Sequence, residues 1–541
     1  MNNEELDKTI HFCLTRSLFI FHSSLFIKPM FHYGKDTLTV GKTVLLADGK
    51  IKGVLCQEIR QKIEESHQFV KNIVENQEVV YGINTGFGPL CDTPISIEQT
   101  KTLQYNLLIS HSVGVGNPIL PEIAKTMLIC KVHALAQGFS GISLATLERI
   151  LWHIDNDVIP LVPEKGSVGA SGDLAPLAHL FLPLLGLGSV YVEGKIVSAK
   201  EALAKFGLSP IELGPKEGLA LINGTQFILA HAVRAVARLH HCLELADIIG
   251  AISLEALMGS VKPFDARLHA IRPFRGCQLV AQRLRKLTED SEVLTSHTDC
   301  GRVQDPYSLR CMPQVHGASR NAWLHLKELT EIELNSVTDN PVILGDHDTI
   351  SGGNFHGQPL ALPLDYATLA AAEVGNIADR RCYLMLEGRF GLPKLLLKET
   401  GLNSGFMIPQ YTTAALVSEN KSLCFPASAD SIPTSLGQED HVSMGSISGR
   451  KLNQVIDNLE YILAIELLYA SQALEFRRPL KSSKIVETTI EKIREFVPFA
   501  TEDKIFSEDI NTLHQLLKTN ILTDIIKSEN LNENYDDFRI S

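Results

Sequence analysis

The tripeptide Ala170-Ser171-Gly172 offers the most unusual chemistry in this chain of 541 residues. It lies in a glycine-rich stretch, and glycine can enter backbone conformations that are closed to other residues. In a tight bend, the amide nitrogen of Gly172 would reach the carbonyl carbon of Ala170. Ring closure with loss of two waters, one from the Ser171 side chain, would leave an exocyclic methylene on an imidazolone. That product is an electrophile, which no unmodified side chain provides. The simpler interpretation is a glycine-rich turn before a helix.

The surroundings of the tripeptide favour the reactive ring. Residues 166–180 resemble the segment that forms 4-methylidene-imidazol-5-one (MIO) in the aromatic amino acid lyases, and the pattern is that of the histidine ammonia-lyases in this family. The resemblance runs from about Gly41 to the C-terminal region. It is carried by separate blocks in a fixed order, namely residues 81–88, 110–111, 218–226, 304–310, 351–356 and 438–444.

The resemblance implies a set of catalytic residues. The β-hydrogen of an amino acid is only weakly acidic, so elimination of ammonia needs an electrophile and a base near Cβ. In the family the electrophile is MIO, made here from residues 170–172, and no metal or diffusible cofactor takes part. The other matching catalytic positions are Tyr81 as the base, Asn223 and Tyr307 around MIO and the substrate amine, Phe355 beside MIO, and Glu439.

Binding of the substrate carboxylate is assigned by the same resemblance to Arg310, with Gln304 as a further substrate-binding residue. A planar guanidinium holds a carboxylate through two parallel hydrogen bonds. The alternative for Arg310 is an ordinary ion pair. Tyr307 precedes Arg310 by three residues, so the two side chains would share one face of a helical turn.

Substrate choice rests on His111 and Glu439. Phenylalanine-type lyases carry an apolar pair where this chain has Ser110-His111, and a glutamine where it has Glu439. An imidazole offers a donor and an acceptor, which a histidine and a carboxylate satisfy. A phenyl ring would leave both groups buried and unpaired, at a cost of about 1–3 kcal/mol each. The alternative for Glu439 is a carboxylate at a helix start or on the surface.

The resemblance therefore implies deamination of L-histidine to trans-urocanate and ammonia, the first step of histidine degradation. Two alternatives stay open. One is a tyrosine or phenylalanine ammonia-lyase or aminomutase of the same family, and the other is a non-catalytic scaffold member. The family also implies a homotetramer whose active sites combine residues from three subunits.

The amino-acid composition excludes some classes of binding partner. The formal net charge is -12, without a long basic cluster, which argues against nucleic acid or an anionic membrane as a partner. The ten cysteines form no CxxC pair, so free thiols in a reducing cytoplasm are expected. The acidic start is wrong for a secretory signal. Residues before Met30 lie outside the resemblance, and Met30 is an alternative start.

The expected fold is mainly α, with a long-helix bundle as its core and a small mixed N-terminal region, as in the helical fold of the aromatic amino acid lyases and fumarases. We expect three parts, which are an extension over residues 1–30, a mixed region over 31–137 that carries the Tyr81 loop, and a helical domain over 138–541. Short strands are expected at 37–40 and 43–46, with turns at Gly41-Lys42 and Asp48-Gly49, and a hairpin at 190–197. An apolar run without proline predicts a buried helix over 226–258. A further helix should end before Arg478-Pro479.

Overall fold

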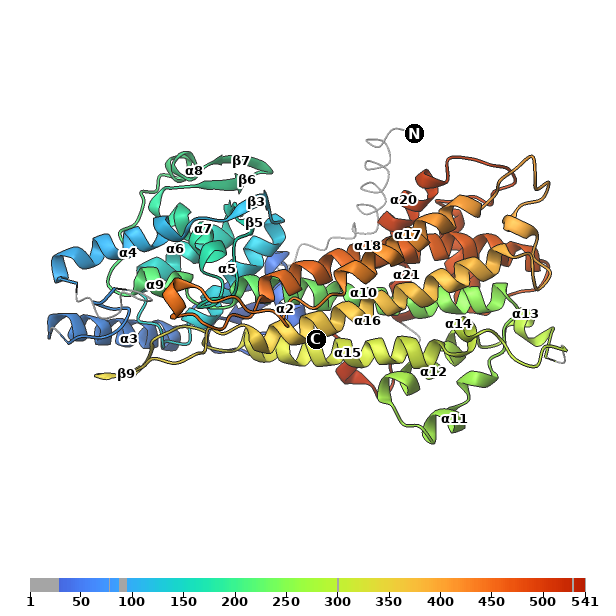
Figure 1. The fold of residues 1–541 in the computed structure, drawn as a ribbon, viewed down its shortest axis with the longest axis horizontal. Helices are drawn as coiled ribbons and strands as arrows, with labels where there is room; N and C mark the ends of the chain where they lie inside the picture. Colours follow the sequence, from blue (N-terminus) through green and yellow to red (C-terminus); the bar gives the residue numbers. More distant parts are fainter. Residues whose placement is uncertain (1–28, 77, 87–94, 299–300, 528–529, 541) are drawn as a thin grey trace, which may run out of the picture.

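Four long helices that pack side by side form the centre of this computed structural model (Figure 1). They are α10 (Gln226–Ala256), α15 (Met312–Leu334), α16 (Gln358–Leu386) and α18 (Gly445–Leu474). The structure describes residues 29–76, 78–86, 95–298, 301–527 and 530–540. The expected extension over residues 1–30 lies almost entirely outside them. The mainly helical fold class is confirmed, because buried aliphatic side chains on all four helices form one continuous core.

One end of the bundle carries the smaller elements (Figure 1). In chain order their bounds are β1 (Met30–His32), α2 (Val40–Ala47), β2 (Lys52–Val54), α3 (Gln57–Glu75), α4 (Ile97–His111), β3 (Val115–Pro118), α5 (Pro121–Leu135), α6 (Leu144–Asp155), β4 (Ile159–Pro160), β5 (Pro163–Lys165), α7 (Leu174–Phe181), β6 (Ser189–Val192), β7 (Lys195–Ser198), α8 (Ala199–Lys205), α9 (Glu217–Ile222), β8 (Val342–Gly345) and β9 (Asp348–Ile350). The strands form only small separate sheets.

Shorter helices surround the bundle elsewhere. They are α11 (Ala266–Ala270), α12 (Arg275–Leu287), α13 (Glu292–Thr295), α14 (Tyr307–Arg310), α17 (Met407–Leu423), α19 (Lys484–Arg494), α20 (Phe506–Leu517) and α21 (Ile521–Lys527). No helix in the described part of the chain is both long enough and apolar enough to cross a membrane.

The two strands expected at 37–40 and 43–46 are wrong, because α2 takes their place. Thr39 caps this helix by accepting a hydrogen bond from the Lys42 amide at 3.2 Å, so the expected turn at Gly41-Lys42 lies inside a helix. Val40, Thr43 and Leu46 are buried on one helical face against the core. Tertiary packing here overrides the strand preference of β-branched residues.

Other expectations are confirmed. Residues 226–258 contain α10, and α18 ends at Leu474, before Arg478-Pro479. β6 and β7 form the expected antiparallel hairpin. Its turn residues Glu193 and Gly194 both have positive φ, at 51° and 75°, as a tight two-residue hairpin turn requires.

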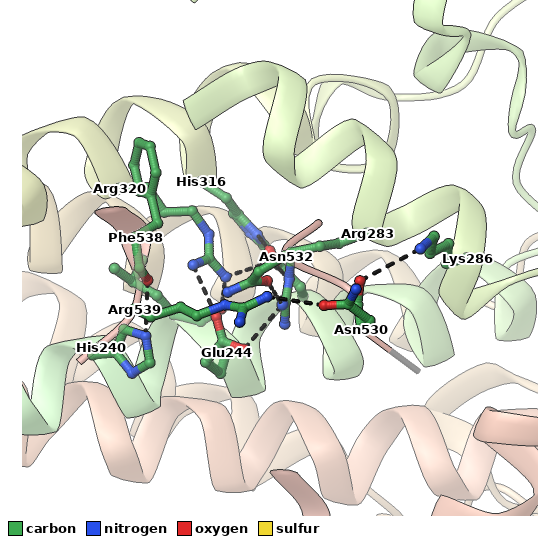
Figure 2. A network of polar contacts seen from close by, with 12 residues as sticks. His240, Glu244, Arg283, Lys286, His316, Arg320, Asn530, Asn532, Phe538 and Arg539 are labelled. Carbon is green, nitrogen blue, oxygen red and sulfur yellow. Dashed lines mark hydrogen bonds and ion pairs between the residues drawn. The ribbon is translucent and has the colours of Figure 1, made fainter. Parts of the chain in front are cut away.

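A buried network of charged side chains joins α10, α12 and α15 (Figure 2). Asp247 of α10 accepts hydrogen bonds from Arg283 at 2.7 Å and from Arg320 at 2.6 Å. Although burial alone would raise the pKa of Asp247, these guanidinium groups and His316 hold it well below its usual range. The C-terminal segment closes over the network, where His240 binds the Phe538 carbonyl at 3.1 Å. His240 therefore binds backbone, as does its neighbour His241, whose ring bonds the Leu517 carbonyl.

Candidate active site

Residues 170–172 adopt a bend that few sequences tolerate. Ser171 has a φ of 50° and Gly172 a φ of 78°, so two consecutive residues lie in the left-handed region. That region is uncommon for a serine, and such strain persists only where the surroundings impose it. The bend lies directly before α7, so the expected turn before a helix is present.

Gly224 imposes this bend. The Gly224 amide donates to the Ser171 carbonyl at 3.3 Å, and the Gly224 carbonyl accepts from the Asp173 amide at 2.8 Å. A Cβ on Gly172 would lie 2.1 Å from the Gly224 oxygen, which is impossible without rearrangement. Only glycine therefore fits position 172.

The N-termini of four helices surround the bend. α7 follows it, α10 begins two residues after Gly224, and α18 approaches through the Met444 amide, which donates to the Val168 carbonyl at 3.0 Å. α16 begins after Gly357, where a Cβ would lie 2.9 Å from the Ser443 hydroxyl. Helix N-termini carry partial positive charge, so this end of the bundle favours a carboxylate or a developing negative charge.

Asp173 links the bend to α10. Its buried carboxylate accepts hydrogen bonds from the amides of Phe227 at 3.0 Å and Ile228 at 2.9 Å, and from the Ser167 hydroxyl at 3.1 Å. Burial raises the pKa of Asp173 to about 7, against these hydrogen bonds. Asp173 lies within residues 166–180, the segment that resembles the family, but the sequence alone assigns it no role.

Helix α9, next to two of the predicted site residues, lies at the same end of the molecule as α7 (Figure 1). Asn223 ends α9 beside Gly224. Tyr81 packs partly buried against the core, and the next residue, Gly82, would place a Cβ 2.4 Å from Leu219 of α9. Phe355 lies two residues before Gly357. Phe87 and Gly88 of the Tyr81 block lie outside the described residues.

His111 is the last residue of α4, a helix that packs on α7 and α9. The Ser110 hydroxyl lies 3.0 Å from the His111 Nδ1 atom. Burial lowers the pKa of His111, which favours the neutral ring, against a hydrogen bond to the Leu107 backbone. A neutral imidazole offers one donor nitrogen and one acceptor nitrogen.

Three of the predicted residues carry a buried polar atom without a hydrogen-bond partner in the described part of the chain. These atoms are Asn223 Oδ1, Arg310 Nε and Glu439 Oε2. Buried polar atoms are normally hydrogen-bonded, and each exception needs an explanation. Atoms left unpaired in this way are candidates to bind a ligand.

Arg310, Tyr307 and Gln304 lie at the opposite end of the bundle. The Arg310 guanidinium lies 4.6 Å from the centre of the Tyr307 ring, so the expected shared face is confirmed. Tyr307 lines a cavity of about 540 Å³ with Asn376 of α16. Asn376 is nineteen residues from Gly357, or ~28 Å along the helix at 1.5 Å per residue. One chain therefore does not bring Arg310 to the bend.

The structure also shows two features that sequence reasoning missed. His356 and His441 are linked between their rings at 3.2 Å, which ties the Phe355 segment to the Glu439 loop. Lys131 of α5 is buried and donates a hydrogen bond to the Asn223 carbonyl. A signal for Lys131 was present, since it is a lone charge in an apolar helical run.

Comparisons with known proteins agree with this geometry. Residues 38–495 match the model of the family described as aromatic amino acid lyase. A histidine ammonia-lyase from Natranaerobius thermophilus is 46% identical over 466 residues, covering 86% of this chain and 92% of that protein. The crystal structure of histidine ammonia-lyase from Trypanosoma cruzi has a TM-score of 0.87 at 40% identity, covering 94% of this chain and 97% of that one. A tyrosine aminomutase from Streptomyces globisporus also has a TM-score of 0.87, at 34% identity and 93% and 99% coverage.

Proposed function

Because this chain belongs to the aromatic amino acid lyase family, we propose that it is a histidine ammonia-lyase that converts L-histidine to trans-urocanate and ammonia. The observation that carries the proposal is the bend at Ser171 and Gly172 held against Gly224. It has the form that closure of an MIO ring requires. A non-catalytic scaffold would have no use for a strained serine in this position.

Different residues of the chain carry out different steps of the elimination of ammonia. MIO, once formed from residues 170–172, supplies an electrophile that activates the substrate. Tyr81 removes the proton from Cβ, Asn223 accepts a hydrogen bond from the amine through its unpartnered Oδ1, and Arg310 binds the carboxylate. Tyr307 stacks on the Arg310 guanidinium and orients it. The helix N-termini around the bend stabilise negative charge that develops there.

The fold alone does not choose the substrate, since a tyrosine aminomutase shares it. His111 and Glu439 make the choice. The His111 ring and the buried Oε2 of Glu439 offer partners for the two nitrogens of an imidazole. A phenyl or phenol ring would leave at least one of these groups unpaired.

A shared active site in a homotetramer explains why Arg310 and Ser171 lie at opposite ends of one chain. Leu362, Tyr366, Leu369 and Tyr383 lie about half exposed along one face of α16, between these two ends. A second copy packed antiparallel on this face would bring its Arg310 toward the bend of the first. The free thiols among the described cysteines agree with a cytoplasmic enzyme.

Product analysis tests the proposal. Purified protein should release trans-urocanate from L-histidine, and it should release little cinnamate from phenylalanine or coumarate from tyrosine. Its intact mass should be lower than the sequence mass by two waters. Preferential coumarate or cinnamate formation would show a related lyase instead. An unmodified mass without any product would show the scaffold alternative.

Replacement of Arg310 by lysine should chiefly raise the KM for histidine. Lysine keeps the charge but loses the second parallel hydrogen bond, worth about 1.5–3 kcal/mol, which corresponds to a rise of about 10- to 150-fold. Steady-state kinetics and thermal unfolding measure the two possible roles separately. A lowered melting temperature with unchanged KM would assign Arg310 to a structural ion pair.

A further inference from the structure

Lys131 is an unexpected residue at the centre of the fold. Every residue of α5 from Thr126 to Leu135 is buried, and Lys131 is 1% exposed. Burial of an ammonium group costs several kcal/mol unless it is bound by polar partners. Burial lowers the pKa of Lys131 to about 7, while Asp339 and Asp173 oppose this effect. Because burial of the Lys131 ammonium group is unfavourable, a specific contact of this group is expected to compensate for it.

The partner of Lys131 indicates the reason. Its Nζ donates to the carbonyl oxygen of Asn223, the residue that carries one of the unpartnered polar atoms of the site. The same peptide unit ends in the Gly224 amide, which donates to the Ser171 carbonyl at 3.3 Å. A charged donor on the carbonyl of a peptide makes the N–H of that peptide a stronger donor. Lys131 is thus connected to Ser171 through one peptide group.

The next peptide group along the backbone is the support for Gly172. Its carbonyl group, that of Gly224, is separated from the Gly224 nitrogen only by the Cα atom. The carbonyl oxygen accepts from the Asp173 amide and lies where a side chain at position 172 would stand. The Asn223–Gly224 backbone therefore contacts the bend on both sides of Gly172. A shift in that backbone would release the left-handed conformation of Ser171.

We propose that Lys131 is a positioning residue that holds the Asn223–Gly224 peptide in place, and through it the bend from which the ring of residues 170–172 closes. This inference rests on the proposed function. In the closure, the Gly172 nitrogen bonds to the Ala170 carbonyl carbon. The first water forms from the Ala170 carbonyl oxygen and the amide hydrogens of Ser171 and Gly172. The second water forms from the hydroxyl group and the α-hydrogen of Ser171. Lys131 stays on the Asn223 oxygen throughout.

Lys216 provides a matched control, because it is a second buried lysine of the same cluster. Its Nζ bonds Asp339 at 2.7 Å and the Ser140 carbonyl at 3.2 Å, and neither partner belongs to the bend or to the peptide that supports it. Loss of either ammonium should destabilise the protein. Only loss of the one at position 131 should slow dehydration of the tripeptide.

The experiment compares Lys131→Met with Lys216→Met by intact mass at intervals after a short pulse of cell-free synthesis. We expect Lys131→Met to lose its two waters about tenfold more slowly or worse, the factor for one hydrogen bond from a charged donor. Lys216→Met should lose both waters at the wild-type rate in its folded fraction, despite a lower melting temperature. Lys131→Arg, which keeps a charged donor, should restore part of the rate.

Dehydration of Lys131→Met at the wild-type rate would overturn the inference, as would an equal delay in Lys216→Met. If Lys131→Met does not fold, Lys131→Gln replaces it, with Lys216→Gln as control. Glutamine keeps a polar head but is too short to reach the Asn223 oxygen, so the same delay is expected. A wild-type protein at the unmodified mass would refute the proposed function itself, whereas normal dehydration in every variant would refute only the role of Lys131.

Discussion

Ser171→Ala should lose about a thousandfold or more in kcat while the fold stays intact, a loss in the range seen when a covalent catalytic group is removed. Alanine has no hydroxyl to lose, so the methylene carbon of the electrophile cannot form. The substitution removes a single atom at a partly buried position, so packing should survive. Urocanate formation, circular dichroism and intact mass together measure the outcome. The mass should show at most one lost water.

Ser336→Ala is the matched control for this result. Ser336 is partly buried just past the end of α15, far in sequence from residues 170–172, and its hydroxyl donates to the Ile332 carbonyl at 2.8 Å. It should keep full activity and a mass lower by two waters. Wild-type turnover in a folded Ser171→Ala protein would refute the assignment of residues 170–172 as the source of the electrophile.

The long helices could be predicted from sequence because their pattern is local. An apolar run without proline determines α10, and proline limits the helix before Arg478-Pro479. The region around α2 shows where such reasoning stops. Thr39 and Thr43 are β-branched residues, which favour strands. In the structure, Thr39 caps the N-terminus of α2, and Thr43 is buried in α2, which packs on α5. Local preference is weaker than that packing.

The chemistry of the candidate site was accessible from sequence, but its layout was not. Residue types and blocks nominated Asn223, Arg310 and Glu439, and the structure adds that each has an unpartnered buried atom. The distance of ~28 Å along α16 between Gly357, near the bend, and Asn376, beside Tyr307, follows only from the rise of a folded helix. Lys131 is a charged residue in an apolar helical run, but the sequence alone assigns it no role. Its meaning depends on a contact with Asn223, ninety-two residues away in sequence, which no pattern in the chain encodes.

Simultaneous replacement of His111 by leucine and Glu439 by glutamine should cost histidine selectivity more than formation of the electrophile. The two groups that pair with an imidazole are removed, and two hydrogen bonds of about 1.5–3 kcal/mol each correspond to a loss of about 10²- to 10⁴-fold in kcat/KM for histidine. The pocket becomes more apolar, so the penalty against a phenyl ring falls. For phenylalanine or tyrosine we expect a smaller loss or a slight gain. The intact mass should still be lower by two waters, because ring closure depends on the Gly224 support.

A matched double variant tests whether the effect is specific to His111 and Glu439, because it replaces another histidine and another glutamate in the same way. His347 and Glu65 are both exposed and lie outside every block assigned to the site, so His347→Leu with Glu65→Gln makes the same chemical change away from the proposed pocket. This control should keep wild-type kinetics.

If Glu439 also transfers a proton, the single Glu439→Gln variant should lower kcat for every substrate, whereas His111→Leu should affect histidine most. Unchanged histidine kinetics in the His111→Leu, Glu439→Gln protein would show that neither residue lines the ring pocket. The choice of histidine as substrate would then rest on the relatives alone.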